Sequence, residues 1–600
     1  MKNFIYLSLI SAMLLMGSCN DFLDSEDLTR KTSANFPANE KEADEVLTGI
    51  YAHLLYESPE SESSTYIAQL AGDDCLGGNL SYSNNCATNF LLYSGSLNTF
   101  SGLWDRDYTL INRANQAIQE FPNVKEWSSK ASENRHYGEA YFLRAFAYYE
   151  LAQVFGPVPI RTTPSNDNVP RASIDSVYSL IASDMQRAIE LLPDKNYFYG
   201  SNMTGHATKY AAEAMMARIF LFYTGRYGKE ALPNGITRQQ VCNWIDDCVN
   251  NSGNSLVSDQ RNIWCYTNKA TENNPSYRYA YVQNRGLHWE GNSCKETLFA
   301  AKHNLLSNWT YTWFSCTDAQ FYSPSADNYS KTQSYPFGTG WGAGPVSPAM
   351  VDDWKAWSKS QTFTDGYTED PRLTGSIWSY RAYDANDGTT VLFDRRLDSD
   401  EPDYTVSYRY YEQTGYFNKK YININAADST GSASSITSFG RIMYPGISSY
   451  TSQALLQIQD YIYIRFADVL LMQSELEHDA TGLNLVRARS HLAPIPYSLE
   501  AIKNERRFEL AFENLRWWDL LRWSGPSLEE AGQALNKQNG FTLINASKVE
   551  KMCYYDYAAR LKQTQGYWPI PQTEIDLSNG VLTQNPGWDA SAMFKDWNNM

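Results

Sequence analysis

Apolar residues that recur every three or four positions constrain this chain more than any other feature of its sequence. Such spacing places them on one face of a helix, and that face must pack against a neighbour. The pattern predicts helices over residues 104–118, 137–155, 177–192 and 207–227, and helical pairing again over residues 459–523. We therefore expect a mainly α protein.

The predicted helices come in consecutive pairs that are rich in alanine and tyrosine. A helix followed by an antiparallel partner, and then by another such pair, is typical of tetratricopeptide-like stacking, in which each pair buries one face against the next. The full repeat consensus is absent. We expect a tetratricopeptide-like scaffold built from residues 41–230 and 455–600.

Residues 231–454 differ in character and predict a large irregular insertion. Between residues 261 and 345, 17 of 85 residues are Phe, Trp or Tyr, against 14% for the whole chain, and Asn, Ser, Gly and Pro separate them. This composition favours loops and short strands over helices. We expect one domain over residues 41–600, with the insertion between the two halves of its scaffold.

The N-terminus has the form of an export signal. Lys2 precedes an apolar stretch, Phe4–Met16, which is too short to span a bilayer. Met16-Gly17-Ser18-Cys19 looks like a bacterial lipobox, whose cysteine is acylated, although an ordinary signal peptide with a chance cysteine is the alternative. We expect residues 1–18 to be removed, Cys19 to carry the lipid, and residues 19–40 to form a tether.

The formal net charge of -17 argues against nucleic acid and anionic surfaces as partners. Eight cysteines remain beside Cys19, and they allow 105 disulfide connectivities, so the sequence favours no pairing. The seven histidines show no H-E-x-x-H spacing and the chain has no C-x-x-C motif, so we do not expect a zinc site. We expect no cofactor.

Several separated segments resemble the SusD/RagB family. "CNDFLD" is similar to the start of that family after the lipobox, and "YFLRAFAYYELAQVFGPVPI" looks like its helix that ends in a Gly-x-Val-Pro turn. The others are residues 464–475 and 486–489, "NERRFELAFENLRWWDLLRW" and "YWPIPQTEIDLSNGVLTQNPGW". The segments occur in order over nearly the whole chain.

The resemblance implies a lipoprotein of the outer membrane that faces the cell exterior. Members of the family sit over a SusC-like TonB-dependent transporter and capture nutrients for it, mostly glycans and in some members peptides. The family position of the loop 71–90 implies that it lines the ligand site; a solvated loop is the alternative. Its polar candidates are Asp73, Asp74, Asn79, Tyr82, Asn84 and Asn85.

Aromatic residues in the insertion are the other ligand candidates, because flat rings pack against the C–H faces of sugars while polar groups bind the hydroxyls. In an extended strand Trp309, Tyr311 and Trp313 would share one side. They could equally face the scaffold as a sheet core. For Tyr277, Tyr279 and Tyr281 we favour that structural role. Single aromatics near Gly, Asn or Ser are further candidates: Trp289, Tyr322, Tyr329, Tyr335 and Trp341.

Charged residues over 505–516 predict a structural ion-pair network, because opposite charges at helical spacing can pair on adjacent turns. A catalytic acid and base would need two carboxylates isolated in a cleft. The acidic turns 384–388 and 398–403 do not fit the EF-hand spacing, so we expect solvated loops there, with structural calcium as a minor alternative.

The favoured function is therefore non-catalytic capture of an oligosaccharide or polysaccharide, with delivery to a transporter. Capture of peptides is the alternative within the same family, because tyrosine-rich surfaces also bind peptides. A surface glycosidase is less favoured, since the sequence has no nucleophile elbow, metal-ligand motif or phosphate loop.

Overall fold

The computed structural model describes most of the chain between residues 35 and 588. The described ranges are 35–55, 64–76, 97–98, 100–165, 167–197, 203–268, 279–306, 315–316, 322, 344–384, 387–401, 404–406, 414–422, 457–537, 542–545, 548–551 and 556–588.

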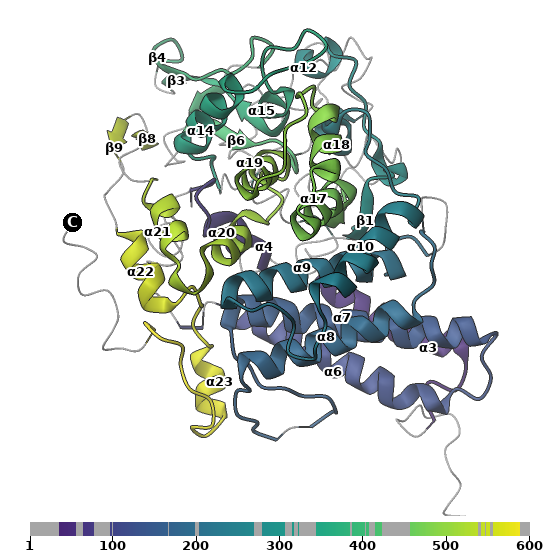
Figure 1. Cartoon of the computed structure of the whole chain (residues 1–600). Coiled ribbons are helices and arrows are strands. Elements are labelled where there is room, and N and C mark those ends of the chain that lie inside the picture. Colours follow the sequence, from purple (N-terminus) through teal and green to yellow (C-terminus); the bar gives the residue numbers. More distant parts are fainter. Residues whose placement is uncertain are drawn as a thin grey trace, which may run out of the picture.

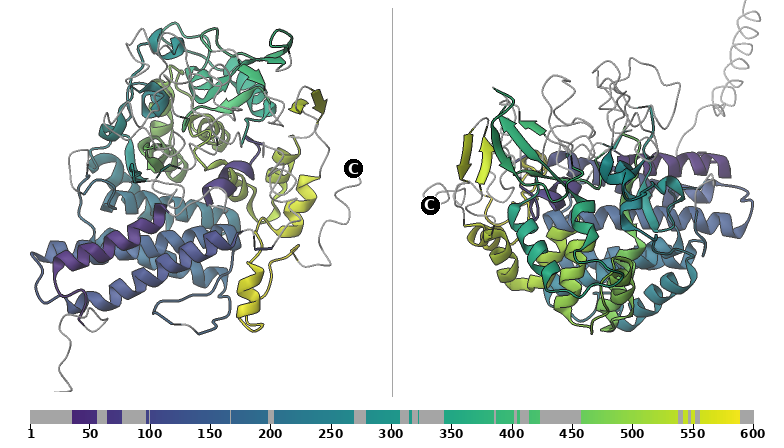
Figure 2. Two further views of the ribbon diagram at one scale, coloured as in Figure 1. Left: turned by 180° about the vertical axis from the view of Figure 1, so that it is seen from behind. Right: turned by 90° about the horizontal axis from the view of Figure 1, so that it is seen from above.

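The N-terminal half is a stack of helices, which occupies the lower part of Figure 1. Each helix packs against the next along the chain from α6 to α10, and α3 lies along α6 and α7, as the left view of Figure 2 also shows. The elements are α3 (Glu40–Tyr51), η1 (Ala52–Leu55), α4 (Ser64–Leu70), α6 (Ser101–Glu120), η4 (Phe121–Asn123), α7 (Lys130–Phe155), α8 (Ile174–Leu191), α9 (Lys209–Tyr227) and α10 (Arg238–Asn251). These helices confirm the helical prediction for this half.

Side-chain caps fix where these helices begin. Ser129, Ser173 and Thr208 each accept a hydrogen bond from the backbone N–H three residues on, at 3.1 Å in every case. Thr237 forms a complete capping box with Gln240 at the start of α10. Such caps satisfy backbone donors that have no partner within the helix.

The α7 and α9 helices are buried on nearly all sides, which explains why neither has a polar face. The α7 helix lies between α6 and α8, while α9 contacts α8, α10 and the C-terminal helix α20 (Arg516–Ser524). Both helices also bury charged side chains, such as Arg144 of α7, which pairs with Asp184 of α8. These two helices therefore form the centre of the scaffold.

The scaffold extends past residue 230, where the sequence analysis placed its boundary. The α10 helix packs against α9 and against α17 (Phe466–Glu477), so it joins the two halves of the chain. Its buried residues Val241, Ile245 and Cys248 recur at helical spacing. Polar residues such as Asn243, Asp246 and Asp247 separate these apolar positions in the sequence.

The C-terminal half begins with a strand. Tyr461–Arg465 form β7, which pairs antiparallel with β1 (Thr297–Ala301), so the helical prediction for residues 459–523 is wrong at its start. The strand is buried on both faces, and its apolar run therefore does not distinguish strand from helix. After α17, the chain continues through α18 (Thr481–Arg489), α19 (Leu499–Glu509), α20, η12 (Gly525–Ser527), α21 (Glu529–Asn536), β8 (Thr542–Asn545), β9 (Lys548–Lys551), α22 (Tyr557–Thr564) and α23 (Gln572–Leu577).

The insertion contains short elements and a small core of its own, in the upper part of Figure 1. Aromatic rings such as Tyr281, Trp378 and Phe417 form that core. The elements are η5 (Gln260–Ile263), η6 (Cys265–Thr267), α12 (Ala280–Gln283), η7 (Gly291–Ser293), β1, α14 (Pro348–Lys359), α15 (Pro371–Ser376), β2 (Ile377–Ser379), β3 (Arg381–Asp384), β4 (Val391–Asp394), β5 (Tyr404–Val406) and β6 (Tyr416–Asn418). The prediction of short strands here is confirmed.

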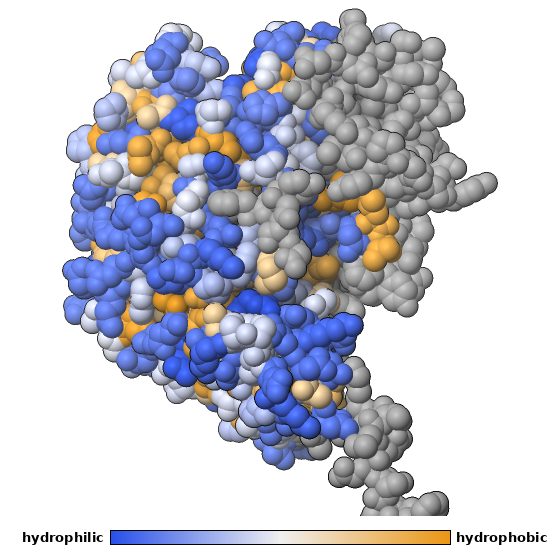
Figure 3. Space-filling view, turned by 90° about the vertical axis from the view of Figure 1, so that its right-hand side faces the viewer, coloured by the Kyte–Doolittle hydropathy of each residue, from blue (hydrophilic) through white to orange (hydrophobic). Residues whose placement is uncertain are grey.

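The face shown in Figure 3 is mostly hydrophilic over the described residues, with hydrophobic residues in separate areas. Across the described chain, the large hydrophobic residues with high exposure are Leu306, Tyr367, Val391, Leu485, Leu499, Leu577 and Val581. Among the described helices, none combines the length and apolar character that crossing a membrane requires.

We predict that the protein loses stability as the pH rises because of Glu213 on α9. Its side chain is fully buried, Asp247 lies nearby, and the Lys209 Nζ is 3.6 Å from the carboxylate. Burial, reinforced by the charge of Asp247, raises the pKa of Glu213 to about 9. Folding therefore takes up a proton between about pH 5 and pH 9, and stability falls through that range.

The Glu213→Gln variant should remove this dependence. We expect its free energy of unfolding at pH 8 to exceed that of the original protein by ~1–3 kcal/mol, with little difference at pH 5. Urea unfolding at both pH values measures the effect, and Glu190→Gln on the surface of α8 is the control. An equal change at both pH values would contradict the argument.

Candidate functional site

Most residues predicted to bind ligand lie outside the described part of the chain, as does the predicted lipidation site Cys19. These candidates are Asn79, Tyr82, Asn84, Asn85, Trp309, Tyr311, Trp313, Tyr329 and Trp341. Asp73, Asp74 and Trp289 are described, and so are the residues that border the segments containing the other candidates. The structure therefore describes only the residues that border most of these candidates.

Asp73 and Asp74, two of the predicted ligand contacts, are buried and bound by arginines of the C-terminal half, and their contact with a ligand stays a prediction. Each is 3% exposed. The Arg516 guanidinium donates two hydrogen bonds to Asp73, at 2.7 and 2.9 Å, and Arg507 donates to Asp74 at 2.9 and 3.0 Å.

The two neighbouring aspartates respond differently to the same environment. Burial opposes ionisation of both, but Arg516 and Arg507 outweigh it at Asp73 and hold its pKa well below the usual range. At Asp74, burial and the charge of Asp73 together raise the pKa despite Arg507. The two arginines thus stabilise one firmly ionised carboxylate beside a second that ionises less readily.

Trp289 is half-buried, and its indole N–H donates to the Ile263 carbonyl at 3.1 Å. This bond fixes the ring at one edge, while part of it remains exposed. Its predicted contact with a ligand stays a prediction.

The structural interpretation of the tyrosines near residue 280 is confirmed for Tyr279 and Tyr281, while Tyr277 lies outside the described residues. Both rings are buried and stacked, with centroids 5.8 Å apart. The Lys419 Nζ lies 3.5 Å from the Tyr281 centroid, and the Tyr279 hydroxyl donates to Glu401. Tyr322, another candidate, is also buried, at 1% exposure.

The acidic turn at residues 398–403 is not simply solvated, contrary to the prediction. Arg285 pairs with both Asp398 and Asp400, and buried Glu401 pairs with Lys419 at 2.6 Å. The described carboxylates of this turn are therefore engaged in ion pairs with the protein. No group of three or more His, Cys, Asp or Glu residues is arranged to hold a metal in the described part of the chain.

The described residues that border two of the segments with predicted ligand residues meet at one point, which we name the first root. The Leu76 N–H donates to the Pro345 carbonyl at 2.9 Å, next to a bridge between Cys75 and Val346. Residues 77–96 follow Leu76 in the chain, and residues 323–343 come just before Gly344 and Pro345. The described residues that border the polar loop and part of the aromatic insertion therefore lie next to each other.

A second root lies nearby. The Cys316 N–H donates to the Gln457 carbonyl at 2.7 Å, and the Gln459 side chain donates to the Tyr421 carbonyl at 3.0 Å. These residues flank segments 317–321 and 423–456. Residues 414–422 connect the two roots, because the Val346 N–H donates to the Tyr416 carbonyl at 2.9 Å.

A buried set of charges lies close to these roots, and we name it the central ion cluster. Arg465 is its hub: the guanidinium is 1% exposed and contacts Glu296, Glu509 and Glu513 at 2.6–2.7 Å. The cluster contains five cations and five carboxylates, namely Arg372, Arg465, Arg487, Arg489 and Lys420 with Glu296, Asp370, Glu505, Glu509 and Glu513.

The predicted ion network around residues 505–516 is confirmed, but its partners are not the expected ones. Arg506 pairs with Asp468 at 2.6 Å and with Asp519 at 2.9 Å, while Arg507 pairs with Asp353 as well as with the two loop aspartates. Glu505 and Glu509 of α19 are members of the central ion cluster. Tertiary contacts thus replace the expected pairing on adjacent turns.

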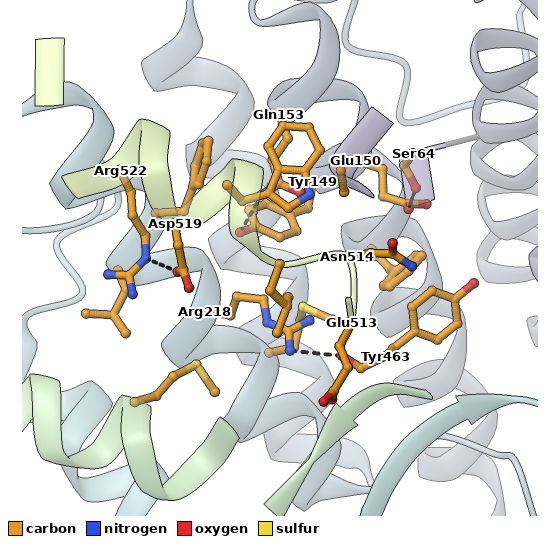
Figure 4. Close-up of a pocket in the computed structure, with 18 of the residues that line it drawn as sticks. Ser64, Tyr149, Glu150, Gln153, Arg218, Tyr463, Glu513, Asn514, Asp519 and Arg522 are labelled. Atoms are coloured by element: carbon orange, nitrogen blue, oxygen red, sulfur yellow. Dashed lines mark hydrogen bonds and ion pairs between the residues drawn. The ribbon is translucent and has the colours of Figure 1, made fainter. Parts of the chain in front are cut away.

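A small internal cavity separates the two halves of the scaffold, and Figure 4 shows its lining. Its volume is about 70 Å³, which suits a few water molecules and is far below the usual size of a ligand pocket. Charged side chains such as Arg218, Glu513 and Asp519 line it beside Phe222 and Trp518. It is therefore too small to be the glycan site.

We predict that Arg465→Met is strongly destabilising, because it leaves three buried carboxylates without their shared partner. Removal of one member of a buried ion pair costs about 3–5 kcal/mol. The control is Arg187→Met, which breaks an exposed pair with Glu190 on α8 and should change stability by less than ~1 kcal/mol. Equal unfolding midpoints in urea for the two variants would refute the structural role of the cluster.

We also predict that Gly344→Ala disturbs the first root. Gly344 has φ +63°, and an added Cβ would lie 2.9 Å from the Tyr322 ring. Gly366 is the matched control, since its φ is +80° but its Cβ would have no neighbour within 4 Å. We expect Gly344→Ala to lower the melting temperature more and to increase cleavage within residues 77–96 and 323–343 during limited proteolysis. Identical behaviour of the two variants would contradict this prediction.

Comparison with known proteins places the whole chain in one group. A family model described as "Starch-binding associating with outer membrane" matches residues 21–221, and the model of the SusD family matches residues 295–588. The chain is 21% identical over 613 residues to SusD-like protein P2 of Formosa agariphila, covering 97% of this chain and 99% of that protein. It is also 23% identical to SusD-like protein P38 of the same organism, covering 73% and 74%.

Solved structures show the same fold. A laminarin binding SusD-like protein aligns with a TM-score of 0.63 at 23% identity, covering 92% of this chain and all of that one. Surface glycan-binding protein A from Bacteroides thetaiotaomicron, solved in complex with laminarihexaose, aligns with a TM-score of 0.61 at 17% identity, covering 91% and 99%. The mainly α, SusD-like fold predicted from the sequence is confirmed, and the chain belongs to the SusD/RagB family.

Proposed function

We propose that this protein is a cell-surface glycan-binding lipoprotein that captures oligosaccharide or polysaccharide without cleaving it. It would deliver the glycan to a partner TonB-dependent transporter of the outer membrane. The lipid on Cys19 would hold it at the outer leaflet, facing out, because several acyl chains anchor a protein far more firmly than one chain does.

The observation that carries this proposal is the common origin of the candidate ligand segments. The described residues that border the polar loop after Leu76 and the aromatic segments on either side of Tyr322 form neighbouring hydrogen bonds. Rings and polar side chains from separate segments can then contribute to one site, which is the combination that sugars require. The glycans named for related structures, laminarin and laminarihexaose, support the ligand class.

The carboxylates of the segment around α19 support a structural role rather than a catalytic one. Glu505, Glu509 and Glu513, in the segment richest in acidic and basic residues, are all engaged by buried cations. The charges of Arg489, Arg465 and Arg372 overcome the effect of burial and hold the pKa of Glu509 far below its usual range. A glycosidase needs a carboxylic acid that can donate a proton beside the scissile bond.

Isothermal titration with laminarihexaose tests the proposal, preceded by a glycan array to find other ligands. We expect at least one of Trp309→Ala, Trp313→Ala and Trp341→Ala to weaken binding by roughly three- to tenfold, because one stacked ring contributes ~0.5–1.5 kcal/mol. Tyr367→Ala is the control, since this ring is 39% exposed and was not assigned to the ligand.

Two results would contradict the proposal. Binding of oligopeptides together with silence toward every glycan would identify a peptide-capturing protein of the RagB type. Shortened products after incubation of the protein with a bound glycan would identify an enzyme. Unchanged affinity in all three tryptophan variants would refute the site while leaving the ligand class intact.

A further inference from the structure

A second and larger cavity opens on the helical scaffold, away from the insertion in sequence. It has a volume of about 380 Å³, which lies within the range of small-molecule pockets. It is formed by α6, by the connection from α7 to α8, and by α23, which lie in the lower part of Figure 1. Its lining includes Trp104, Asp105, Tyr108, Thr109, Asn112, Arg161, Asn168, Glu574, Leu577 and Leu582.

One wall of this scaffold pocket presents polar groups with spare hydrogen-bonding capacity. Asp105, Thr109 and Asn112 occupy successive turns of α6, so they share one face, and all three are exposed. Asn168 lines the pocket from the connection between α7 and α8. Within the described chain, these four side chains form no hydrogen bond with the protein.

The floor of the pocket is rigid and aromatic. The Tyr108 hydroxyl donates to the Pro159 carbonyl at 2.8 Å, and the Tyr108 and Trp104 ring centroids are 4.8 Å apart. Tyr148 packs edge-on against Tyr108 at 6.5 Å. These contacts hold the half-exposed Tyr108 ring in place before any ligand binds, which lowers the entropic cost of binding.

The rim combines an apolar residue with unbalanced negative charge. Leu577, on α23, is 71% exposed. Burial and the neighbouring charge of Asp105 raise the pKa of Glu574, and burial raises that of Asp105. Arg161 is the opposing cation, but its guanidinium donates to the Ser165 and Asp167 carbonyls, at 2.7 and 2.9 Å. The pocket therefore offers more hydrogen-bond acceptors than donors.

We propose that this pocket is a second saccharide-binding site, carried by the scaffold and separate from the insertion. Sugar hydroxyls would donate to Asp105 and Glu574 and would exchange hydrogen bonds with Asn112, while a C–H face of the sugar rests against Tyr108 and Leu577. The uncharged Thr109, Asn112 and Asn168 favour a hydroxyl-rich ligand over a purely cationic one. The inference rests on the proposed function for its ligand class and adds a site to it.

Titration of the purified protein in two backgrounds tests this site. The probes are laminarihexaose, maltohexaose and cellohexaose. In the Trp309→Ala/Trp313→Ala/Trp341→Ala background, which removes the predicted insertion site, we expect residual binding of at least one probe. Adding Asp105→Ala and Asn112→Ala should weaken that residual binding at least tenfold, whereas adding Gln119→Ala, an exposed amide two turns further along α6, should not.

Two outcomes would overturn the scaffold site: residual binding that is equal with and without the pocket substitutions, or no residual binding of any probe. In both cases, tight binding by the original protein would still support the proposed function. Loss of binding in the pocket variant alone supports the scaffold site and refutes the insertion site. Binding of trilysine that depends on Asp105, without saccharide binding to the pocket, overturns the saccharide site in favour of a basic protein partner.

Discussion

The structure depends most on the interaction of Arg465 with three buried glutamates. Its guanidinium donates to Glu296 before β1, to Glu509 at the end of α19 and to Glu513 in the turn before α20. One side chain thus ties the insertion to the C-terminal scaffold. A charge in a medium of low dielectric is costly without partners, so each member of the central ion cluster fixes the positions of the others. Such a cluster specifies one arrangement of the chain more than it adds to net stability.

The central ion cluster continues directly to the second root. Lys420 pairs with Glu513 at 2.6 Å, and the next residue, Tyr421, accepts the hydrogen bond from Gln459 at the second root. Burial lowers the pKa of Lys420 to about 8, which shows how completely this ammonium is removed from water. Binding residues on loops need a rigid support of this kind, because the loops can then vary in sequence without disturbing the fold.

The central ion cluster is balanced in charge, whereas the chain as a whole is strongly negative. The central ion cluster contains equal numbers of cations and carboxylates, so the net charge of -17 resides elsewhere in the chain. Part of that excess lies at the scaffold pocket, where Asp105 and Glu574 share a single nearby arginine. Acceptor-rich surfaces of this type suit neutral, hydroxyl-bearing ligands and disfavour polyanions.

The sequence was enough to predict the helical scaffold, because the apolar spacing over residues 104–227 favours a stack of paired helices. It also determined the family, through motifs at both ends of the chain, and the structural role of Tyr279 and Tyr281. The scaffold pocket was not foreseen, since α6 and α23 are more than 450 residues apart. Spacing alone gave no signal that Asp105 faces Glu574.

The pairing of charges and the contacts between distant segments are visible only in the folded protein. Asp73 and Asp74 look like loop residues in the sequence, yet Arg507 and Arg516, more than 430 residues away, draw them into the core. The Tyr461–Arg465 segment is apolar enough for a helix, and pairing with β1 makes it a strand. Local sequence fixes periodic structure, whereas the partner of a buried charge or of a strand edge depends on contacts that only the folded chain creates.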